Sequence, residues 1–224
     1  MPAAGTGTRM GSELPKQYLL LQDRPILQHT LERLSLLPHL LGIVVCLASN
    51  DHYWEKLTLP TTKPIIPIQG GAERYHSVLN GLQALQTRGH PQDWVLVHDA
   101  ARPCVRPTDI EKLMTQLANH PIGGLLAYPV RDTMKRSNPQ GEVEKTISRE
   151  SLWHALTPQM FRLNLLMEAL QYVLHRGLSV TDEAQAMEYL GYHPVLVEGH
   201  ADNIKITHPQ DLVLATLFIN TPLL

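Results

Sequence analysis

Short apolar runs alternate with amphipathic segments along most of the chain. The apolar runs lie at 41–47, 64–68, 94–98, 122–130 and 193–197, and we expect each to form a strand. Between and after them, apolar residues recur at helical spacing, which predicts helices over 25–37, 72–85, 107–118, 160–175, 182–190 and 209–219. Because the strand runs are continuously apolar, they are typical of a parallel sheet covered by helices on both faces. The pattern predicts a doubly wound α/β fold.

A charged, turn-rich stretch interrupts this alternation at residues 131–150. The sequence NPQG at 138–141 favours a tight turn, and Val143 and Ile147 give the second half some β character. The stretch is too hydrophilic to form core. We therefore expect a β-hairpin that projects from the domain as an arm, with a disordered loop as the alternative.

Composition narrows the possible partners. Of the 224 residues, 43% are hydrophobic, enough for the core of one domain over 1–224. The formal net charge of -2 gives no overall attraction to nucleic acid or to an anionic membrane, so any bound polyanion requires a local cluster of Lys and Arg. No apolar stretch is long enough to span a membrane, and the first residues lack a signal-peptide core. Cys46 and Cys104 fit no metal-ligand spacing, which favours a reducing, cytoplasmic compartment.

A glycine-rich turn opens the chain. Gly5 and Gly7 permit close backbone approach to phosphate oxygens, and Arg9 and Lys16 add positive charge just beyond them. The dinucleotide pattern G-x-G-x-x-G fails because residue 10 is a methionine. Such turns normally follow a central strand, and none precedes this one, so we expect either an upstream start or an absent first strand. The turn predicts phosphate binding, with an ordinary glycine turn as the alternative.

A second pair of glycines lies at the start of a predicted helix. Gly70 and Gly71 follow a strand, and the free backbone amides of such a helix start can bind a ligand. Ser77 adds a hydroxyl one turn later. These groups predict contacts to the edge of a flat base, and a simple tight turn into the helix is the alternative.

Polar residues also follow the apolar run at 94–98. Asp99 and Arg102 lie at its carboxyl end, where open α/β sheets bind ligands. An acid there can hold a ribose or a Mg²⁺–phosphate complex, and Arg102 can contact an anion. The alternative for Asp99 is a turn or capping acid. His98 is expected to pack or cap rather than to catalyse.

Two segments in the last quarter of the chain bear charged residues. Thr181, Asp182 and Glu183 are typical of a helix start, and capping alone would explain the two acids. Lys205 is a lone cation in an apolar, strand-like run. It is expected either on an edge strand or in contact with an anion.

Taken together and in order, the blocks resemble those of the 2-C-methyl-D-erythritol 4-phosphate cytidylyltransferase family. The resemblance runs from residue 2 to about residue 215, and its blocks are PAAGTGTRM, PKQ, VHDAARP, PVRDTMKR, LWHALTPQ, TDEA and EGHADNIKIT. It implies a Rossmann-like nucleotidyltransferase sheet, with helices on both faces and the projecting β-arm. It also implies CTP, a small sugar-alcohol phosphate, Mg²⁺ bound mainly through the CTP phosphates, and a homodimer formed through the arm.

The resemblance assigns a role to each matching residue. Catalytic roles are implied for Arg9, Lys16, Arg149 and Lys205. Nucleotide contacts are implied for Ala3, Ala4, Gly5, Gly71, Ala72, Ser77, Asp99 and Ala100. Acceptor contacts are implied for Arg102, Thr133, Thr157 and Thr181, and the arm residues are expected to complete the partner subunit's site. No protein side chain is expected as a dedicated metal ligand.

The chain departs from the family pattern at three places. The strand before the glycine turn is missing, His200 stands where the family commonly has Arg, and Ala72 stands where an acid is frequent. The first departure leaves a catalytically inactive nucleotide-binding module as an alternative. Two further functions remain as alternatives. One is a cytidylyltransferase that acts on ribitol 5-phosphate, and activity assays with a panel of acceptors would distinguish it. The other is a nicotinamide-dependent oxidoreductase, which the imperfect glycine pattern disfavours.

Overall fold

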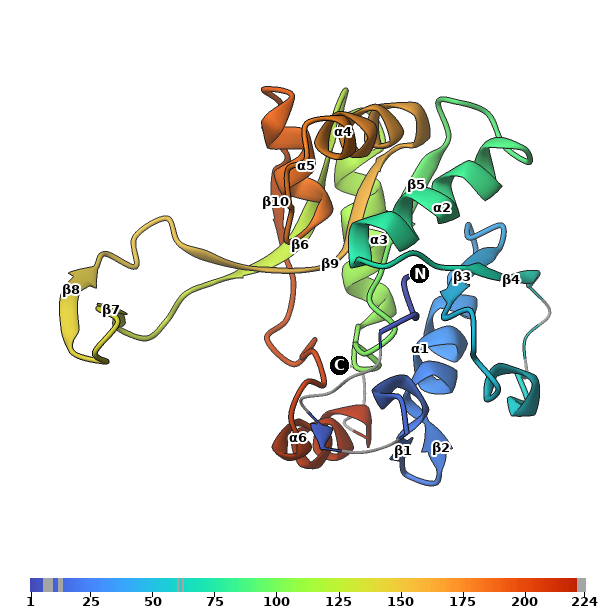
Figure 1. Cartoon of the computed structure of the whole chain (residues 1–224), viewed down its shortest axis with the longest axis horizontal. Coiled ribbons are helices and arrows are strands. Elements are labelled where there is room, and N and C mark those ends of the chain that lie inside the picture. The colour runs from blue at the N-terminus through green and yellow to red at the C-terminus, as the bar shows by residue number, and fades with distance from the viewer. Residues whose placement is uncertain (6–9, 12–13, 60, 62, 221–224) are drawn as a thin grey trace.

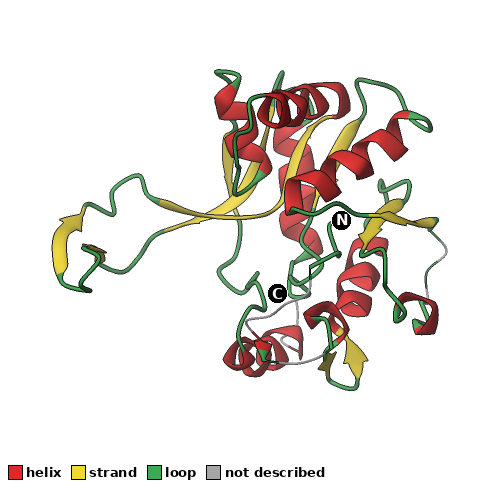
Figure 2. Ribbon diagram, viewed as in Figure 1, coloured by secondary structure: helices red, strands yellow, loops and turns green. Residues whose placement is uncertain are grey.

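The computed structural model describes residues 1–5, 10–11, 14–59, 61 and 63–220. Helices lie on both faces of a central sheet, and a long arm leaves the body on one side (Figures 1 and 2). The helices are α1 (Ile26–Ser35), α2 (Arg74–Gln86), α3 (Pro107–Leu117), α4 (Leu163–His175), α5 (Glu183–Tyr189) and α6 (Pro209–Asn220), with short 3₁₀ turns η2 (Lys16–Tyr18) and η3 (Trp54–Lys56). All six helices were predicted from the apolar periodicity, with bounds shifted by up to three residues.

In the described residues, the strands of the body form three separate sheets. A four-stranded sheet has the order β10-β6-β9-β5, and β3 pairs in parallel with β4. A short hairpin of β1 (Leu20–Leu21) and β2 (Arg24–Pro25) precedes α1. The other strands are β3 (Ile43–Leu47), β4 (Ile65–Gln69), β5 (Trp94–Val97), β6 (Gly123–Pro129), β7 (Met134–Ser137), β8 (Val143–Ile147), β9 (Trp153–Arg162) and β10 (Val195–Glu198).

Strand β9 corrects the expectation of a purely parallel sheet. It runs antiparallel to both β6 and β5 and lies between them. It also occupies residues 160–162, which the sequence placed in a helix, so that α4 begins at Leu163. Met160 and Phe161 are buried, and a continuous apolar run cannot by itself distinguish a buried strand from the first turn of a buried helix.

The core of the described residues has three clusters: two large ones on opposite faces of the sheet, and a smaller one that includes Ile26, Cys104 and Ala215 of α6. One large cluster contains side chains of α1, α3 and β3, and the other contains side chains of α2, α4 and α5. Neighbouring strand residues go to opposite clusters: Leu126 joins the first and Leu125 the second. Such alternation follows from the two-residue period of a strand, so both faces need apolar residues and the strand appears continuously apolar.

The arm at 131–150 is a hairpin, as predicted. Strands β7 and β8 pair antiparallel, and the turn contains Gly141 with a φ of +83°, a conformation that favours glycine. The amide of Gly141 donates to the carbonyl of Asn138. The hairpin extends well away from the body in Figure 1. Because almost all of its side chains are exposed, the fold of a single chain gives the arm no hydrophobic partner.

Residues 1–3 form a short parallel pairing with β3. Met1 N donates to the carbonyl of Val44 at 2.7 Å, and Ala3 N donates to that of Cys46 at 2.9 Å. Pro2 bridges to Cys46 in parallel. Residues 1–3 therefore lie along β3 through an isolated bridge, without a strand of their own.

Candidate active site

Asp99 is the centre of an ion-pair cluster at the carboxyl end of β5. Its Oδ1 lies 3.0 Å from Nε of Arg74, and its Oδ2 lies 2.8 Å from Nζ of Lys205. Arg102 is farther away, with Nε 3.7 Å from Oδ2. Asp99 is buried, and the cations come from three separate segments of the chain. The structure therefore brings together three of the predicted site residues at the predicted edge of the sheet.

A second buried carboxylate holds Arg74, a residue for which the sequence indicated no role. Both guanidinium Nη atoms of Arg74 donate to Glu183, at 2.5 and 3.1 Å, and Glu183 is fully buried. Asp182 caps α5 as predicted, accepting from Gln185 N at 2.9 Å. Capping does not explain Glu183, however. The only local signal was an arginine at the first position of α2, directly after the glycine turn.

Thr157 and His98 form a buried scaffold behind Asp99. Thr157 Oγ1 accepts a hydrogen bond from the amide of Asp99 at 3.1 Å and lies 3.0 Å from Nδ1 of His98. His98 Nε2 lies 3.1 Å from the carbonyl of Arg102. Asn203 donates to the carbonyl of Thr157 at 2.8 Å and accepts at its own carbonyl from Arg102 at 2.6 Å. These bonds fix the backbone on both sides of the cluster, and His98 packs as expected.

The electrostatics of the cluster fix two protonation states. Burial alone would raise the pKa of Asp99, but Arg74 and Lys205 outweigh burial and hold that pKa well below its ordinary value. Burial lowers the pKa of His98 to about 4. At neutral pH, Asp99 is therefore an anion and His98 is uncharged.

The N-terminal loop and the glycine turn before α2 lie against each other. A Cβ on Gly70 would come within 2.7 Å of the Cβ of Ala4 and 2.9 Å of Oγ of Ser77. The amide of Gly71 donates to that Oγ at 3.0 Å. Only a glycine at position 70 allows this approach. Ala72 is exposed beside the turn and Ser77 is buried beneath it, so Ala4, Gly71, Ala72 and Ser77, all predicted to contact the nucleotide, lie in one region with Gly70.

Lys16 reaches the same region from η2. Its Nζ donates to the carbonyl of Ile206 at 3.3 Å, next to Lys205, and Ile206 N donates to the carbonyl of Ala101 at 2.9 Å. Ala3 is buried and accepts at its carbonyl from the side chain of Gln17. Gly5 is exposed, and Ala100 is buried beside Asp99. Arg9, predicted with Lys16 to contact phosphates, lies outside the described residues.

Among the described residues, three cations, Arg74, Arg102 and Lys205, lie within 4 Å of Asp99 or Glu183, and Lys16 lies nearby on the carbonyl of Ile206. The whole chain has a formal net charge of -2, so this gathering of Lys and Arg is the kind of local cluster that the composition required for polyanion binding.

Three predicted residues lie outside this cluster. Thr133 and Arg149 are exposed on the arm, where Arg149 donates to the carbonyl of Arg131. Thr181 is exposed before α5, and its amide and hydroxyl both donate to Gln185. His200, which stands where the family commonly has Arg, pairs with Asp109, with Nδ1 2.8 Å from Oδ1.

Known proteins resemble this chain over almost its whole length. A family model for 2-C-methyl-D-erythritol 4-phosphate cytidylyltransferase matches residues 1–221. The enzyme of that name from Hahella chejuensis is 52% identical over 98% of this chain and 91% of its own length. That from Vibrio parahaemolyticus is 48% identical over 98% and 94%.

Solved structures agree in fold. The Francisella tularensis 2-C-methyl-D-erythritol 4-phosphate cytidylyltransferase superposes with a TM-score of 0.84 at 37% identity, covering 97% of this chain and 96% of its own. The Thermus thermophilus enzyme gives 0.78 at 33% identity, covering 97% and 95%. The ordered motifs, the cation cluster at the sheet edge and these matches lead to one conclusion. This chain belongs to the 2-C-methyl-D-erythritol 4-phosphate cytidylyltransferase family.

Proposed function

We propose that the Asp99 cluster catalyses transfer of CMP from CTP to 2-C-methyl-D-erythritol 4-phosphate. The products are 4-diphosphocytidyl-2-C-methyl-D-erythritol and pyrophosphate, in the non-mevalonate route to isoprenoid precursors. The observation that supports this most directly is the meeting of Arg102 and Lys205 with Asp99 at the carboxyl end of β5, with Lys16 on the carbonyl of Ile206, the residue after Lys205. Two polyanionic substrates require such a concentration of positive charge.

The chemistry requires electrostatic stabilisation more than a strong base. The nucleophile is a phosphate oxygen that is already anionic, and the obstacle is its approach to a second highly charged anion. Lys16, with Arg9, is proposed to offset the charge that develops on the α-phosphate and the leaving pyrophosphate. Lys205 is proposed to hold the acceptor phosphate. In the described structure Lys205 pairs with Asp99, so an arriving phosphate would compete with that carboxylate for the ammonium.

The nucleotide is proposed to bind at the start of α2. Gly70 lies against Ala4 of the N-terminal loop and against Ser77. The amide of Gly71 donates to the hydroxyl of Ser77, so a base that binds this amide would replace that hydrogen bond. Backbone amides at a helix start can read the polar edge of a cytosine without a charged side chain. A backbone contact at position 72 does not depend on the side chain, so Ala72 is compatible with this role.

Mg²⁺ fits this site as an ion held mainly by substrate phosphates. Among the described residues, no three His, Cys, Asp or Glu side chains group as a metal site. Asp99 offers one ionised carboxylate, and Mg²⁺ commonly takes one or two carboxylates together with phosphates and water. When bound, the ion would neutralise charge on the triphosphate, while Asp99 would help to orient it.

The arm is proposed to form a homodimer and to complete the partner's site. Thr133 and Arg149 are exposed on a hairpin that projects away from the body of its own chain (Figure 1). A pair of chains that exchange arms would bury the hairpin and bring these side chains to a second active site. The measured mass in solution should be that of a dimer.

Mixing two variants, assayed at an acceptor concentration low enough that each alone is nearly inactive, would test the exchange. In a heterodimer of Lys16→Ala and Arg149→Ala, one site would have both defects and the other neither. An equal mixture after subunit exchange should therefore regain roughly a quarter of the wild-type activity. No regain, with exchange confirmed by mass, would mean that the arm does not act across subunits.

The length of the helices and the state of the two cysteines are relevant to the cellular compartment of the protein. No helix in the described part of the chain is long and apolar enough to cross a membrane. Cys46 and Cys104 are both free and buried. Unpaired thiols are usual in a reducing compartment, which supports a proposed cytoplasmic location.

Pyrophosphate release by the purified chain is the test of the function. CTP, Mg²⁺ and methylerythritol phosphate are supplied together and then omitted one at a time. Release that requires all three would support the proposal. Equal release with ribitol 5-phosphate would instead favour the related cytidylyltransferase, and binding of CTP without release would favour an inactive nucleotide-binding module.

A further inference from the structure

The segment that carries Lys205 has no regular secondary structure. Residues 199–207 follow β10 and precede α6, and we call them the lysine loop. Within this loop, Nζ of Lys205 lies 2.8 Å from Oδ2 of Asp99. Because no helix or strand holds the loop, its contacts with other elements decide where the ammonium of Lys205 lies.

The start of α3 contacts the lysine loop at two places. Arg106, the N-cap residue of α3, donates from Nε and Nη2 to Oδ2 of Asp202, at 2.9 and 2.6 Å. In the first turn of α3, Asp109 accepts from the amide of His200 at 3.0 Å and lies 2.8 Å from Nδ1 of that residue. The helix therefore holds the first half of the loop through side chains of both signs.

Asp202 depends on Arg106 for its hydrogen bonds. Both side chains are mostly buried, with 17% of Arg106 and 16% of Asp202 exposed. Among the described residues, the other carboxylate oxygen of Asp202, Oδ1, is buried and accepts no hydrogen bond. Without Arg106, no described group would donate to this carboxylate, and a buried charge without a partner is costly. The carboxylate would regain hydrogen bonds from water only if the loop moved outward.

A movement of Asp202 would reach Lys205. The next residue, Asn203, is fully buried, and its carbonyl accepts from Arg102 at 2.6 Å. The amide of Ile204 donates back to the carbonyl of Asp202 at 2.7 Å, so the backbone is compact from Asp202 to Lys205. A displacement at one end of such a short, hydrogen-bonded turn is passed to the other end.

We propose that Arg106 is a positioning residue for the reaction: through Asp202 it holds the lysine loop so that Lys205 meets the acceptor phosphate, an inference that rests on the proposed role of Lys205. Arg106 lies outside every motif of the family resemblance. In the described part of the chain, its guanidinium donates to Asp202 and to no other residue.

Three single variants of the full chain test this role. Arg106→Met removes the charge and the donors but keeps much of the aliphatic volume. Arg106→Lys is the conservative variant, because both nitrogens of Arg106 contact one oxygen of Asp202, which a single ammonium can also reach. Arg162→Met is the matched control. It also removes a partly buried arginine that contacts α3, but at the other end of that helix, where Arg162 donates to the carbonyl of Ala118.

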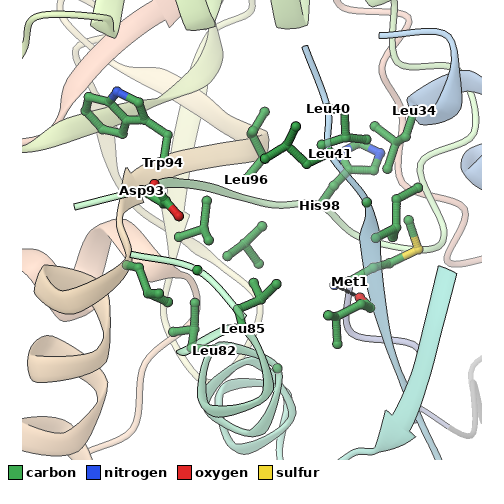
Figure 3. Close-up of a pocket in the computed structure, with 18 of the residues that line it drawn as sticks. Met1, Leu34, Leu40, Leu41, Leu82, Leu85, Asp93, Trp94, Leu96 and His98 are labelled. Atoms are coloured by element: carbon green, nitrogen blue, oxygen red, sulfur yellow. Dashed lines mark hydrogen bonds between the residues drawn. The ribbon is translucent and has the colours of Figure 1, made fainter. Parts of the chain in front are cut away.

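The control lies away from the lysine loop. The guanidinium of Arg162 stacks on Trp94, 3.7 Å from the ring centroid. Trp94 begins β5 and His98 directly follows its last residue, so the two lie at opposite ends of this strand, along the pocket in Figure 3. Asp99, the partner of Lys205, comes next after His98. Arg162→Met therefore perturbs the end of β5 that is remote from the site.

Steady-state pyrophosphate release gives the kinetic test. Arg106→Met should raise KM for the acceptor on the order of 10-fold, because small misplacements of a binding group are costly. It should change KM for CTP by less than about twofold, because the glycine turn proposed to bind the nucleotide is held by other elements. Arg106→Lys should recover most of the loss, and Arg162→Met should match wild type. An equal rise in both KM values would overturn the proposal.

A double variant tests whether Arg106 acts through Lys205. Added to Lys205→Met, Arg106→Met should cost almost nothing more, since both changes remove the same contact. Fully additive losses would overturn the proposal. If Arg106→Met does not fold, Asp202→Asn replaces it in each test, because it weakens the pair without leaving a buried anion. The same selective rise in KM for the acceptor is expected, and its absence would count equally against the role of Arg106.

Hydrogen exchange separates this inference from the proposed function. The amide of Ile206 donates to the carbonyl of Ala101 at 2.9 Å, so its exchange reports whether the loop is in place. It should exchange on the order of 10-fold faster in Arg106→Met, and at the wild-type rate in Arg162→Met. Unchanged exchange in Arg106→Met would overturn the proposal. A wild type that releases no pyrophosphate would defeat the proposed function, and exchange would then decide whether Arg106 places the loop.

Discussion

Replacing Arg74 by methionine would remove the cation that joins the two buried carboxylates of the site. Arg74 bridges Asp99 and the fully buried Glu183, at 3.0 and 2.5 Å. Methionine keeps much of the aliphatic volume but removes the charge and the hydrogen-bond donors. Asp99 would retain Lys205 and Arg102, whereas Glu183 would lose the cation that both of its oxygens contact.

The expected cost follows from the uncompensated charge of Glu183. Removing one partner of a buried ion pair typically costs about 3–5 kcal/mol of unfolding free energy. For a chain of this size, such a loss corresponds to a fall in melting temperature of about 10 °C or somewhat more. Arg24→Met is the matched control, because Arg24 pairs with Glu32 at 2.7 Å but is half exposed, and such surface pairs contribute about 1 kcal/mol or less.

The unfolding free energy that Arg74→Met loses should increase as pH rises. Burial raises the pKa of Glu183 and Arg74 acts against that rise, so removing Arg74 should raise the pKa further. A carboxyl whose pKa is higher in the folded than in the unfolded state stabilises the fold at low pH and loses that stability as pH rises. The difference between wild type and Arg74→Met should therefore be larger at pH 8 than at pH 5.

Urea unfolding of wild type, Arg74→Met and Arg74→Met/Glu183→Met at both pH values measures this loss. The double variant should regain most of the stability, because an apolar pair leaves no buried charge. A single-variant loss below about 1 kcal/mol, or one that is the same at pH 5 and pH 8, would refute the reasoning.

Three further predictions concern catalysis and acid stability. Lys16→Ala should lower kcat by about 10²–10³ with an unchanged melting temperature, and wild-type turnover would remove its catalytic role. Arg149→Ala should raise KM for the acceptor and leave KM for CTP unaltered; a matched rise in both would argue for a general effect on folding or assembly. His98 is buried with a pKa of about 4, below that of the unfolded state, so it favours folding above pH 6.5 and this contribution falls progressively down to pH 4. His98→Gln should reduce the acid-induced loss of stability by about 3 kcal/mol, and an unchanged pH profile from urea unfolding would contradict this.

Local sequence determined most of the secondary structure and the place of the main site. The six helices lie within three residues of their predicted bounds because helical spacing of apolar residues is a local property. The arm was evident from a charged stretch with NPQG at its middle, since turn residues restrict only their own backbone. Asp99 was predicted at a ligand-binding edge because it directly follows a buried strand. The roles of the site residues in binding and catalysis stay predictions.

Tertiary structure alone decided which distant groups meet. Arg74 and Glu183 are separated by 109 residues, and the sequence around neither residue predicts that the two pair. Strand β9 lies antiparallel between β6 and β5, which its apolar composition does not specify, because strand order is set by packing across the whole sheet. Periodicity is encoded within a few residues, whereas ion pairs and strand order depend on where the entire chain goes.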